Sequence, residues 1–195
     1  DTVISIAGDT SVTEGQTAHY TLNLTQPADT EVTVTLSYKG VAQDGTDFNG
    51  VYTVKIPAGQ SSATFDIKTI DDKLTEPTEK FEISISGTSG GNFENLVVSP
   101  TNGKIETSII DNDAPPTIDL DANNSSGATG NDFKTTFTEG GTGVSIADTD
   151  IKITDPDSTQ LTGATVVLTN TQPNDSLSYT KVPGINVTSA TDPVT

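Results

Sequence analysis

The strongest constraint on the fold of this chain is a two-residue apolar repeat that recurs along almost its whole length. Between residues 32 and 38, four apolar residues alternate with Thr and Ser, and the runs 20–24, 63–67 and 81–85 alternate in the same way. Because successive side chains of a β-strand point to opposite faces, each run places its apolar side chains on one face of a half-buried strand. No segment carries a helical apolar stripe of useful length. The sequence therefore predicts an all-β fold.

A short proline-containing connection at residues 111–116, Asp-Asn-Asp-Ala-Pro-Pro, divides the alternating runs into two groups. Two consecutive prolines make such a connection stiff and mark a domain boundary. The segment Val-Thr-Glu-Gly-Gln-Thr at 12–17 is echoed by Phe-Thr-Glu-Gly-Gly-Thr at 137–142, as in repeated modules. We therefore expect two tandem antiparallel β-sandwiches, residues 1–113 and residues 114–195, of which the second is partial.

The charge balance narrows the classes of partner. Twenty-seven acidic residues face nine basic ones, which gives a formal net charge of -18. This charge argues against nucleic acid and anionic membranes as partners, and no apolar run is long enough to enter a bilayer. Two interpretations remain open: a very soluble or halophilic surface, or carboxylates that bind divalent cations. The chain has no Cys, so disulfides are excluded and Ca²⁺ is a candidate for the stabilising role they would otherwise play.

The sequence gives little support for a catalytic site. The single histidine, His19, lies in the alternating run 18–24 on the face opposite Tyr20, where we expect it to be exposed. Without Cys or a second His, a catalytic triad would depend on that residue, and no nucleophile turn surrounds it. Paired carboxylates act on glycosides, but the chain lacks the Trp platforms that commonly hold sugars. The sequence predicts a protein that is not an enzyme.

Acidic residues gather at the ends of the predicted strands in the first half of the chain, where loops can converge. They are Glu14, Asp44, Asp47, Asp71, Asp72, Glu76, Asp111 and Asp113. Ca²⁺ takes six to eight oxygen ligands, and several loops at one end of a sandwich can supply them. Any one group alone also fits an ordinary solvated turn, since Asp and Gly are common turn residues.

Several ordered motifs in residues 3–113 resemble the Calx-β domain, a calcium-binding β-sandwich found in sodium–calcium exchangers and bacterial surface proteins. The motifs are Val12-Thr13-Glu14-Gly15, Asp44-Gly45-Thr46-Asp47-Phe48, Ile56-Pro57-Ala58-Gly59, Ile70-Asp71-Asp72 with Glu76, Glu79 and Phe81, and Ile109-Ile110-Asp111-Asn112-Asp113. The resemblance implies a Ca²⁺ cluster at the C-terminal end of the first domain. The implied ligands are Glu14, Asp47, Asp71, Asp72, Glu76, Asp111, Asn112 and Asp113.

Two departures from the Calx-β pattern imply fewer or weaker ions than in the exchangers. Lys73 stands where strong calcium binders have a third Asp, and Asn112 replaces the middle Asp of the closing triplet. The Asn amide still offers a carbonyl oxygen, whereas the Lys ammonium repels a cation.

The second half resembles bacterial cadherin-like repeats. Residues 111–116 are similar to a cadherin linker, and Asp155-Pro156-Asp157 is similar to the motif that reaches back to it. The resemblance implies that Asp155 and Asp157, with Asp119 and Asp121, complete an interdomain Ca²⁺ site, and that Glu139 serves a following junction. Asp-Pro-Asp is equally an ordinary turn, and this alternative stays open.

Together these resemblances imply a structural extender of a large repeats-in-toxin type adhesin, secreted to the bacterial cell surface. Ca²⁺ would hold the angle between neighbouring tandem domains of one chain, and we expect the fragment itself to be a monomer. Two alternatives remain: a Ca²⁺ sensor domain of a transporter, and a glycan- or protein-binding module of the same adhesin. The loop at residues 123–133 is where such a ligand would bind.

Overall fold

The computed structural model describes residues 1–180 and 182–188, and the chain forms two compact units, Asp1–Thr159 and Gln160–Thr195. Residues 181 and 189–195 of the predicted second domain lie outside the described residues. The predicted domain boundary after residue 113 falls inside the first unit and stays a prediction.

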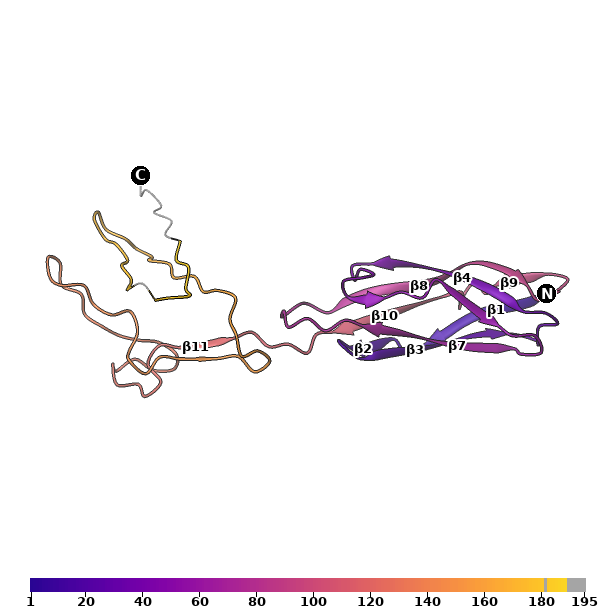
Figure 1. Cartoon of the computed structure of the whole chain (residues 1–195), viewed down its shortest axis with the longest axis horizontal. Coiled ribbons are helices and arrows are strands. Elements are labelled where there is room, and N and C mark those ends of the chain that lie inside the picture. Colours follow the sequence, from indigo (N-terminus) through magenta and orange to yellow (C-terminus); the bar gives the residue numbers. More distant parts are fainter. Residues whose placement is uncertain (181, 189–195) are drawn as a thin grey trace. The chain divides into compact units, whose positions relative to one another are not determined.

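Residues 2–110 form two five-stranded sheets (Figure 1). The first sheet contains, in spatial order, β5 (Phe48–Asn49), β7 (Ser62–Thr69), β3 (Thr17–Leu24), β1 (Thr2–Gly8) and β9 (Leu96–Val98). The second contains β2 (Ser11–Thr13), β10 (Lys104–Ile110), β8 (Glu79–Gly90), β4 (Val32–Gly40) and β6 (Thr53–Ile56). Among the described residues no helix occurs, so the predicted all-β class is confirmed. Nor does that part of the chain contain a helical span with the length and apolarity to cross a bilayer.

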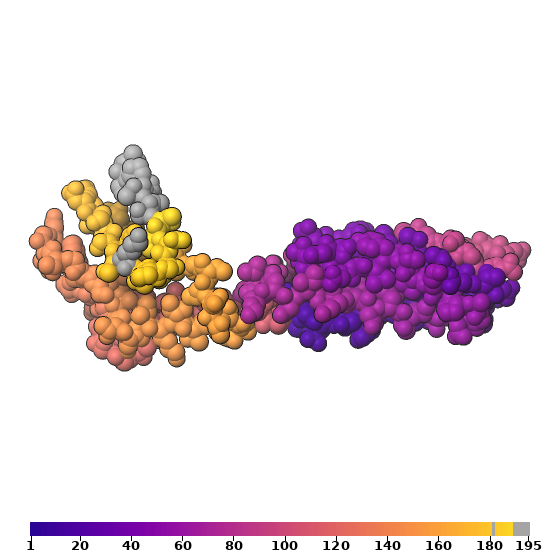
Figure 2. Space-filling view, viewed as in Figure 1, coloured from indigo at the N-terminus to yellow at the C-terminus, as the bar shows by residue number. Residues whose placement is uncertain are grey.

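The two-residue repeat produces one hydrophobic core that both sheets share. In β4, Val32, Val34 and Leu36 are buried and their neighbours are not, as the alternation predicts. The hydroxyl of Tyr20 on the first sheet contacts that of Thr107 on the second at 2.7 Å, which satisfies both polar groups inside the core. Figure 2 shows the closely packed surface of these strands, coloured indigo to magenta.

Two strand pairs are parallel, whereas the other strand pairs of the sandwich are antiparallel as predicted. Strand β1 pairs with β9, and β10 pairs with β2 in the register Ile109↔Val12 and Ile110↔Thr13. Because parallel strands run in the same direction, β2 and β10 end at the same end of the sheet, and the chain segments that follow them lie side by side. This pairing places residue 14 next to residue 111.

After residue 113, the described residues contain one small sheet, in which β11 (Thr117–Asp119) pairs antiparallel with β12 (Lys152–Thr154). Ile118 and Ile153 lie in it. Most other apolar residues that were expected to form strands in this half of the chain lie outside strands and are exposed: Phe137, Val144, Ile146, Ile151, Val166, Leu168, Leu177, Tyr179, Ile185 and Val187. A half-buried strand needs a second layer against its apolar face, and residues 114–180 and 182–188 do not supply one.

The stacked pair Phe48 and Phe81 yields a stability prediction. Their ring centroids are 4.3 Å apart, and both side chains are fully buried. Replacing a buried Phe by Ala removes its contacts and leaves a cavity, so Phe81→Ala should lower the free energy of unfolding by about 3–5 kcal/mol. Urea denaturation followed by circular dichroism measures the change. The matched control is Phe137→Ala at an exposed position, which should change stability by no more than about 0.5 kcal/mol. Equal effects of the two variants would contradict this location of the core.

Candidate metal centre

The parallel β2–β10 pair builds the centre of an acidic site at one end of the sandwich. The backbone amide of Glu14 donates to the carbonyl of Ile110 at 2.9 Å and continues the ladder beyond the strands. Gly15 follows with φ +74°, and a Cβ there would lie 3.0 Å from the Cβ of Asp71. Gly at this position both permits the turn and lets the loop that carries Asp71 approach.

Thr69, at the end of β7, ties two further acidic loops to the same edge. Its hydroxyl donates to the carbonyl of Gln16 at 2.8 Å, and the next amide, that of Ile70, donates to the carbonyl of Asp47 at 2.9 Å. The loop after β7 and the turn before β5 are therefore held beside the β2–β10 edge. The fold, through backbone contacts, brings four loop segments together.

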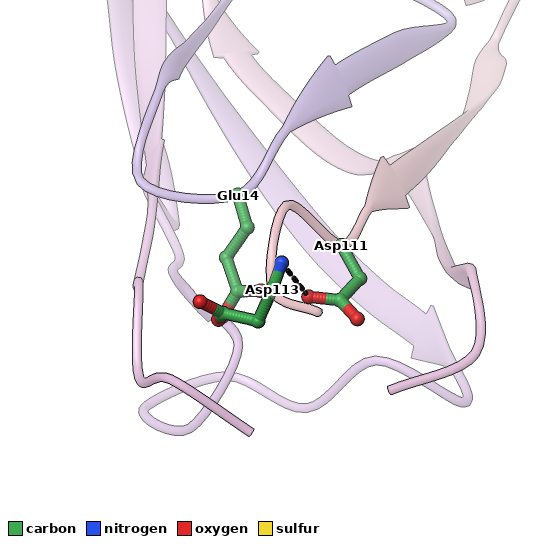
Figure 3. Close-up of side chains that lie close together, drawn as sticks. All are labelled: Glu14, Asp111 and Asp113. Carbon is green, nitrogen blue, oxygen red and sulfur yellow. Dashed lines mark hydrogen bonds between the residues drawn. The ribbon is translucent and has the colours of Figure 1, made fainter. Parts of the chain in front are cut away.

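Three carboxylates form the centre of this group. One oxygen each from Glu14, Asp111 and Asp113 lies within 4.8 Å of the others, and Figure 3 shows the three side chains converging. Glu14 is only 7 % exposed. Asp111 is fixed by two backbone amides, that of Asp113 at 2.9 Å and that of Glu76 at 2.7 Å. The three oxygens are close enough for one cation to contact them all.

A cleft next to the three carboxylates is lined by Glu14, Asp47, Glu76, Pro77, Glu79, Ile109 and Asp111. Glu79 was not among the predicted ligands, although its position carries a signal. It lies two residues before Phe81 and four before Ile83, so it occupies the inward face of β8 at the first position of that strand. A carboxylate on an inward face needs a polar partner or a cation.

The pKa values of several acids in the group are raised. The pKa of Glu14 rises to about 7, first through burial and then through the charges of Asp72, Asp111, Asp113 and Asp71. Burial followed by neighbouring carboxylates also raises the pKa of Glu76, Glu79 and Asp113. The pKa of Asp111 is instead lowered, mainly because the amides of Asp113 and Glu76 donate to its carboxylate. The group therefore contains more negative charge than its own hydrogen bonds stabilise.

The other predicted ligands of the first domain surround the three carboxylates. Asp71 accepts a hydrogen bond from the side-chain amide of Asn112 at 3.1 Å, and Asp72 accepts one from the amide of Leu74 at 2.7 Å. Asp47 accepts from the amide of Gln43 at 2.6 Å. These hydrogen bonds fix each carboxylate to its own loop. From there the charges of Asp71 and Asp72 raise the pKa of Glu14, and those of Asp72 and Asp47 raise the pKa of Glu76.

Lys73 has an unexpected relation to the site. Its φ is +88°, a left-handed conformation that is unusual for a residue other than Gly, and its backbone amide donates to Asp113 at 3.1 Å. The residue that departs from the Calx-β ligand pattern thus fixes a central carboxylate through its main chain.

The remaining candidates lie away from the three carboxylates. Asp44 accepts hydrogen bonds from the hydroxyl of Tyr52 at 2.5 Å and the amide of Gly50 at 2.6 Å, and so orders its own turn. Asp155 accepts from the amides of Asp157 and Ser158, which is the ordinary turn that the sequence left open.

Asp157 does reach the linker, as its carboxylate accepts the amide of Ala114 at 2.6 Å and its charge contributes to the raised pKa of Asp113. Asp119 accepts the amide of Asp121 at 3.1 Å, whereas the carboxylate of Asp121 lies in a separate group with Asp148 and Asp150. Glu139 is exposed. His19 is exposed as expected, with its ring 2.8 Å from Asp66.

The donor set of the site favours a hard cation. Every side-chain ligand atom that the grouped residues offer is an oxygen, and the chain has no Cys thiolate to favour a soft metal. Carboxylates on loops of different length suit the variable geometry of Ca²⁺ better than the strict octahedron of Mg²⁺. The residues present fit the ion that the sequence implied.

The sandwich is similar to known protein domains in sequence and in structure. The LapA domain family matches residues 1–112. The apo-form Calx CBD1 domain aligns with a TM-score of 0.50 at 24 % identity, over 57 % of this chain and 98 % of that domain. CBD12 from CALX1.2 aligns with a TM-score of 0.48 at 23 % identity, over 56 % of this chain and 45 % of that one. No curated protein matches the chain. The likeness to CBD1 confirms the predicted Calx-β-like fold.

The raised pKa of Glu14 predicts a pH dependence of the metal-free protein. A carboxyl group whose pKa is higher in the folded state stabilises the fold fully below its unfolded value of 4.5, and that stabilisation is lost as the pH rises through about 7. At 1.36 kcal/mol per pKa unit, the loss amounts to about 3 kcal/mol. Urea denaturation in EDTA between pH 4.5 and 8 should show this decline.

Glu14→Gln removes the titrating group and should flatten that part of the profile. Glu106→Gln, at an exposed position paired with Lys80, is the control and should keep the decline. A profile that is the same in both variants would show that Glu14 does not carry it.

Proposed function

Because the chain belongs to the LapA domain family, we propose that it is a calcium-binding structural module of a large bacterial cell-surface adhesin of the repeats-in-toxin type. Its role in this proposal is mechanical rather than catalytic. The module extends the adhesin from the cell, and its partners are the neighbouring tandem domains of the same chain.

The raised pKa of the buried Glu14 is the observation that carries the calcium proposal. Glu14 lies beside Asp111 and Asp113, and the charges of Asp71 and Asp72 add to theirs. Such a group is costly to keep ionised without a positive partner. A bound Ca²⁺ would supply two positive charges and accept six to eight oxygen ligands from it.

The residues of the site connect loops that are far apart in sequence. Glu14 follows β2, Asp113 precedes the proline pair, and Asp113 accepts the amide of Lys73 from the loop between β7 and β8. Pulling these carboxylates toward one centre would fix the three segments relative to each other. The segment that leaves the sandwich would then be held at its base.

Asp157 extends the same arrangement into the residues that follow. Its carboxylate accepts the amide of Ala114, one residue beyond Asp113. Neutralising Asp113 would remove the repulsion between these two acids and favour this contact. Ca²⁺ thereby would stiffen the linker, which is the property that an extender needs.

A thermal melt tests calcium binding. Titration of CaCl₂ into the EDTA-treated protein should raise the melting temperature, because a ligand that binds only the folded state stabilises it by mass action. Asp113→Asn should remove most of that rise. Saturation near millimolar Ca²⁺ is expected for an extracellular module, whereas saturation near micromolar would favour a sensor.

MgCl₂ and the variant Asp29→Asn are the controls for this melt. Asp29 is exposed and lies outside the acidic group, so its substitution should leave the Ca²⁺ response unchanged. If Ca²⁺ does not change the melting temperature, or if Ca²⁺ and Mg²⁺ raise it equally, the proposed calcium function is refuted.

The linker proposal has its own measurement. The ¹⁵N heteronuclear NOE of the Ala114 amide should rise on addition of CaCl₂, because its hydrogen bond to Asp157 becomes more persistent. Asp157→Ala should prevent the rise, and Asp132→Ala, an exposed substitution in the same half of the chain, should not. If the amide is equally rigid with and without Ca²⁺, the ion does not stiffen this linker.

A further inference from the structure

A second acidic group lies in the segment that follows the sandwich. One carboxylate oxygen each from Asp121, Asp148 and Asp150 lies within 4.8 Å of the others. The β11–β12 register pairs Asp119 with Lys152, and the amide of Asp148 donates to the carbonyl of Leu120 at 2.8 Å. The antiparallel pair therefore brings the chain just after β11 against the chain just before β12. These acids come together through strand pairing and share no residue with the first site.

Asp121 is a fully buried acid that the surrounding loop keeps ionised. It has no solvent exposure, and its two oxygens accept the amides of Ser125 at 2.9 Å and Ser126 at 2.8 Å. The hydroxyl of Ser126 first, and then the amides of Ser126 and Ser125, lower the pKa of Asp121. The hydroxyl of Ser125 also donates to Asp148 at 2.6 Å. A negative charge is thus held in a place that water does not reach.

Asp150 provides an independent sign of a missing ligand. One of its oxygens, Oδ2, accepts the amide of Asn123 at 3.0 Å, while Oδ1 is buried and accepts no hydrogen bond in the part of the chain that the structure describes. A buried acceptor without a partner loses its hydration and gains nothing in return. The orphaned oxygen belongs to an acid that already faces two other carboxylates.

In the part of the chain that the structure describes, no lysine forms an ion pair with these three acids. Within residues 1–180 and 182–188, the ion pairs of the lysines involve only Glu31, Glu82 and Glu106, all in the sandwich. Three acids at one place, one of them fully buried, then carry an uncompensated charge whose desolvation is costly. A cation bound among them would balance the charge and give the unpartnered Oδ1 of Asp150 a ligand bond.

We propose that Asp121, Asp148 and Asp150 form a second divalent-cation site that takes Ca²⁺. The ligand atoms are all oxygens, and they come from a loop and a strand end with unequal spacing, which suits the flexible coordination of Ca²⁺. This proposal does not rest on the function proposed above, since no residue of the first site takes part.

The site would hold together a part of the chain that has little core. Ile151, just before β12, and Ile153, within it, are 44 % and 48 % exposed, so burial contributes little to closing the pair. A cation that joins Asp121 to Asp148 and Asp150 would connect the two strand ends directly. Metal clips of this kind are a known substitute for a large core in small structural units.

NMR on the full chain tests the second site with CaCl₂ as the probe. In a Glu14→Gln/Asp111→Asn background, which removes central acids of the first site, the amides of Asn123, Ser125 and Ser126 should still shift and saturate. These amides donate to Asp150 and Asp121, so they report on the group directly. Adding Asp150→Asn should weaken the apparent affinity by about tenfold or more.

The matched control in the same background is Asp132→Asn, an exposed acid of the same segment, which should leave the affinity unchanged. Asp148→Asn is a second test if Asp150→Asn alters the spectrum without Ca²⁺. The proposal is overturned if the three amides do not shift, or if they shift equally in the Asp150 and Asp132 variants at constant ionic strength.

Failure of the first site has a different outcome. In the protein without substitutions, the amides of Glu76 and Asp113, which donate to Asp111, would then not respond to Ca²⁺. The two proposals are therefore refuted by different resonances.

Discussion

Repulsion among carboxylates that the fold forces together is the main electrostatic constraint on this structure. The parallel pairing of β2 with β10 places Glu14 beside Asp111, and the loops after β7 and before β5 add Asp71, Asp72 and Asp47. Buried Glu14 responds by binding its proton more tightly, with a pKa of about 7. A proton on Glu14 reduces this excess of negative charge, and a Ca²⁺ bound as proposed would compete with that proton.

The sandwich can tolerate this repulsion because its stability is generated elsewhere. Phe48, Phe81 and the alternating aliphatic residues of β4 and β8 form the shared core, and the Tyr20–Thr107 contact joins the sheets inside it. The acids lie at strand ends, where the backbone is already fixed by ladder hydrogen bonds and where side chains can reach water or an ion. Core and site are thus separated along the strands, so the charge of one can change without repacking the other.

The sequence predicted the all-β class and most of the acids that the structure brings together at the first site, because both depend on local patterns such as the alternation at 32–38 and the acid-rich turns. It missed features that depend on which strands become neighbours. The parallel β2–β10 contact is one, and the inward position of Glu79 at the start of β8 is another. Asp44, an acid at a predicted strand end, and Asp155, a predicted ligand, accept hydrogen bonds within their own turns. The proximity of Asp148 and Asp150 to Asp121 follows only from the β11–β12 register, across a segment that forms no strand.

The two acidic groups follow one structural rule with two different pairings. In the first, parallel strands end at the same edge, so the residues that follow β2 and β10 meet; in the second, antiparallel strands place the end of β11 against the start of β12. In both, a fully or nearly buried acid, Glu14 or Asp121, lies at the centre and more accessible acids surround it. The two buried acids differ in their surroundings. Hydrogen bonds from Ser126 and Ser125 lower the pKa of Asp121, whereas burial first, and then the charges of neighbouring carboxylates, raise the pKa of Glu14 to about 7. A cation bound at the first group would therefore compete with the proton of Glu14, whereas the hydrogen bonds to Asp121 already favour its ionised form at the second.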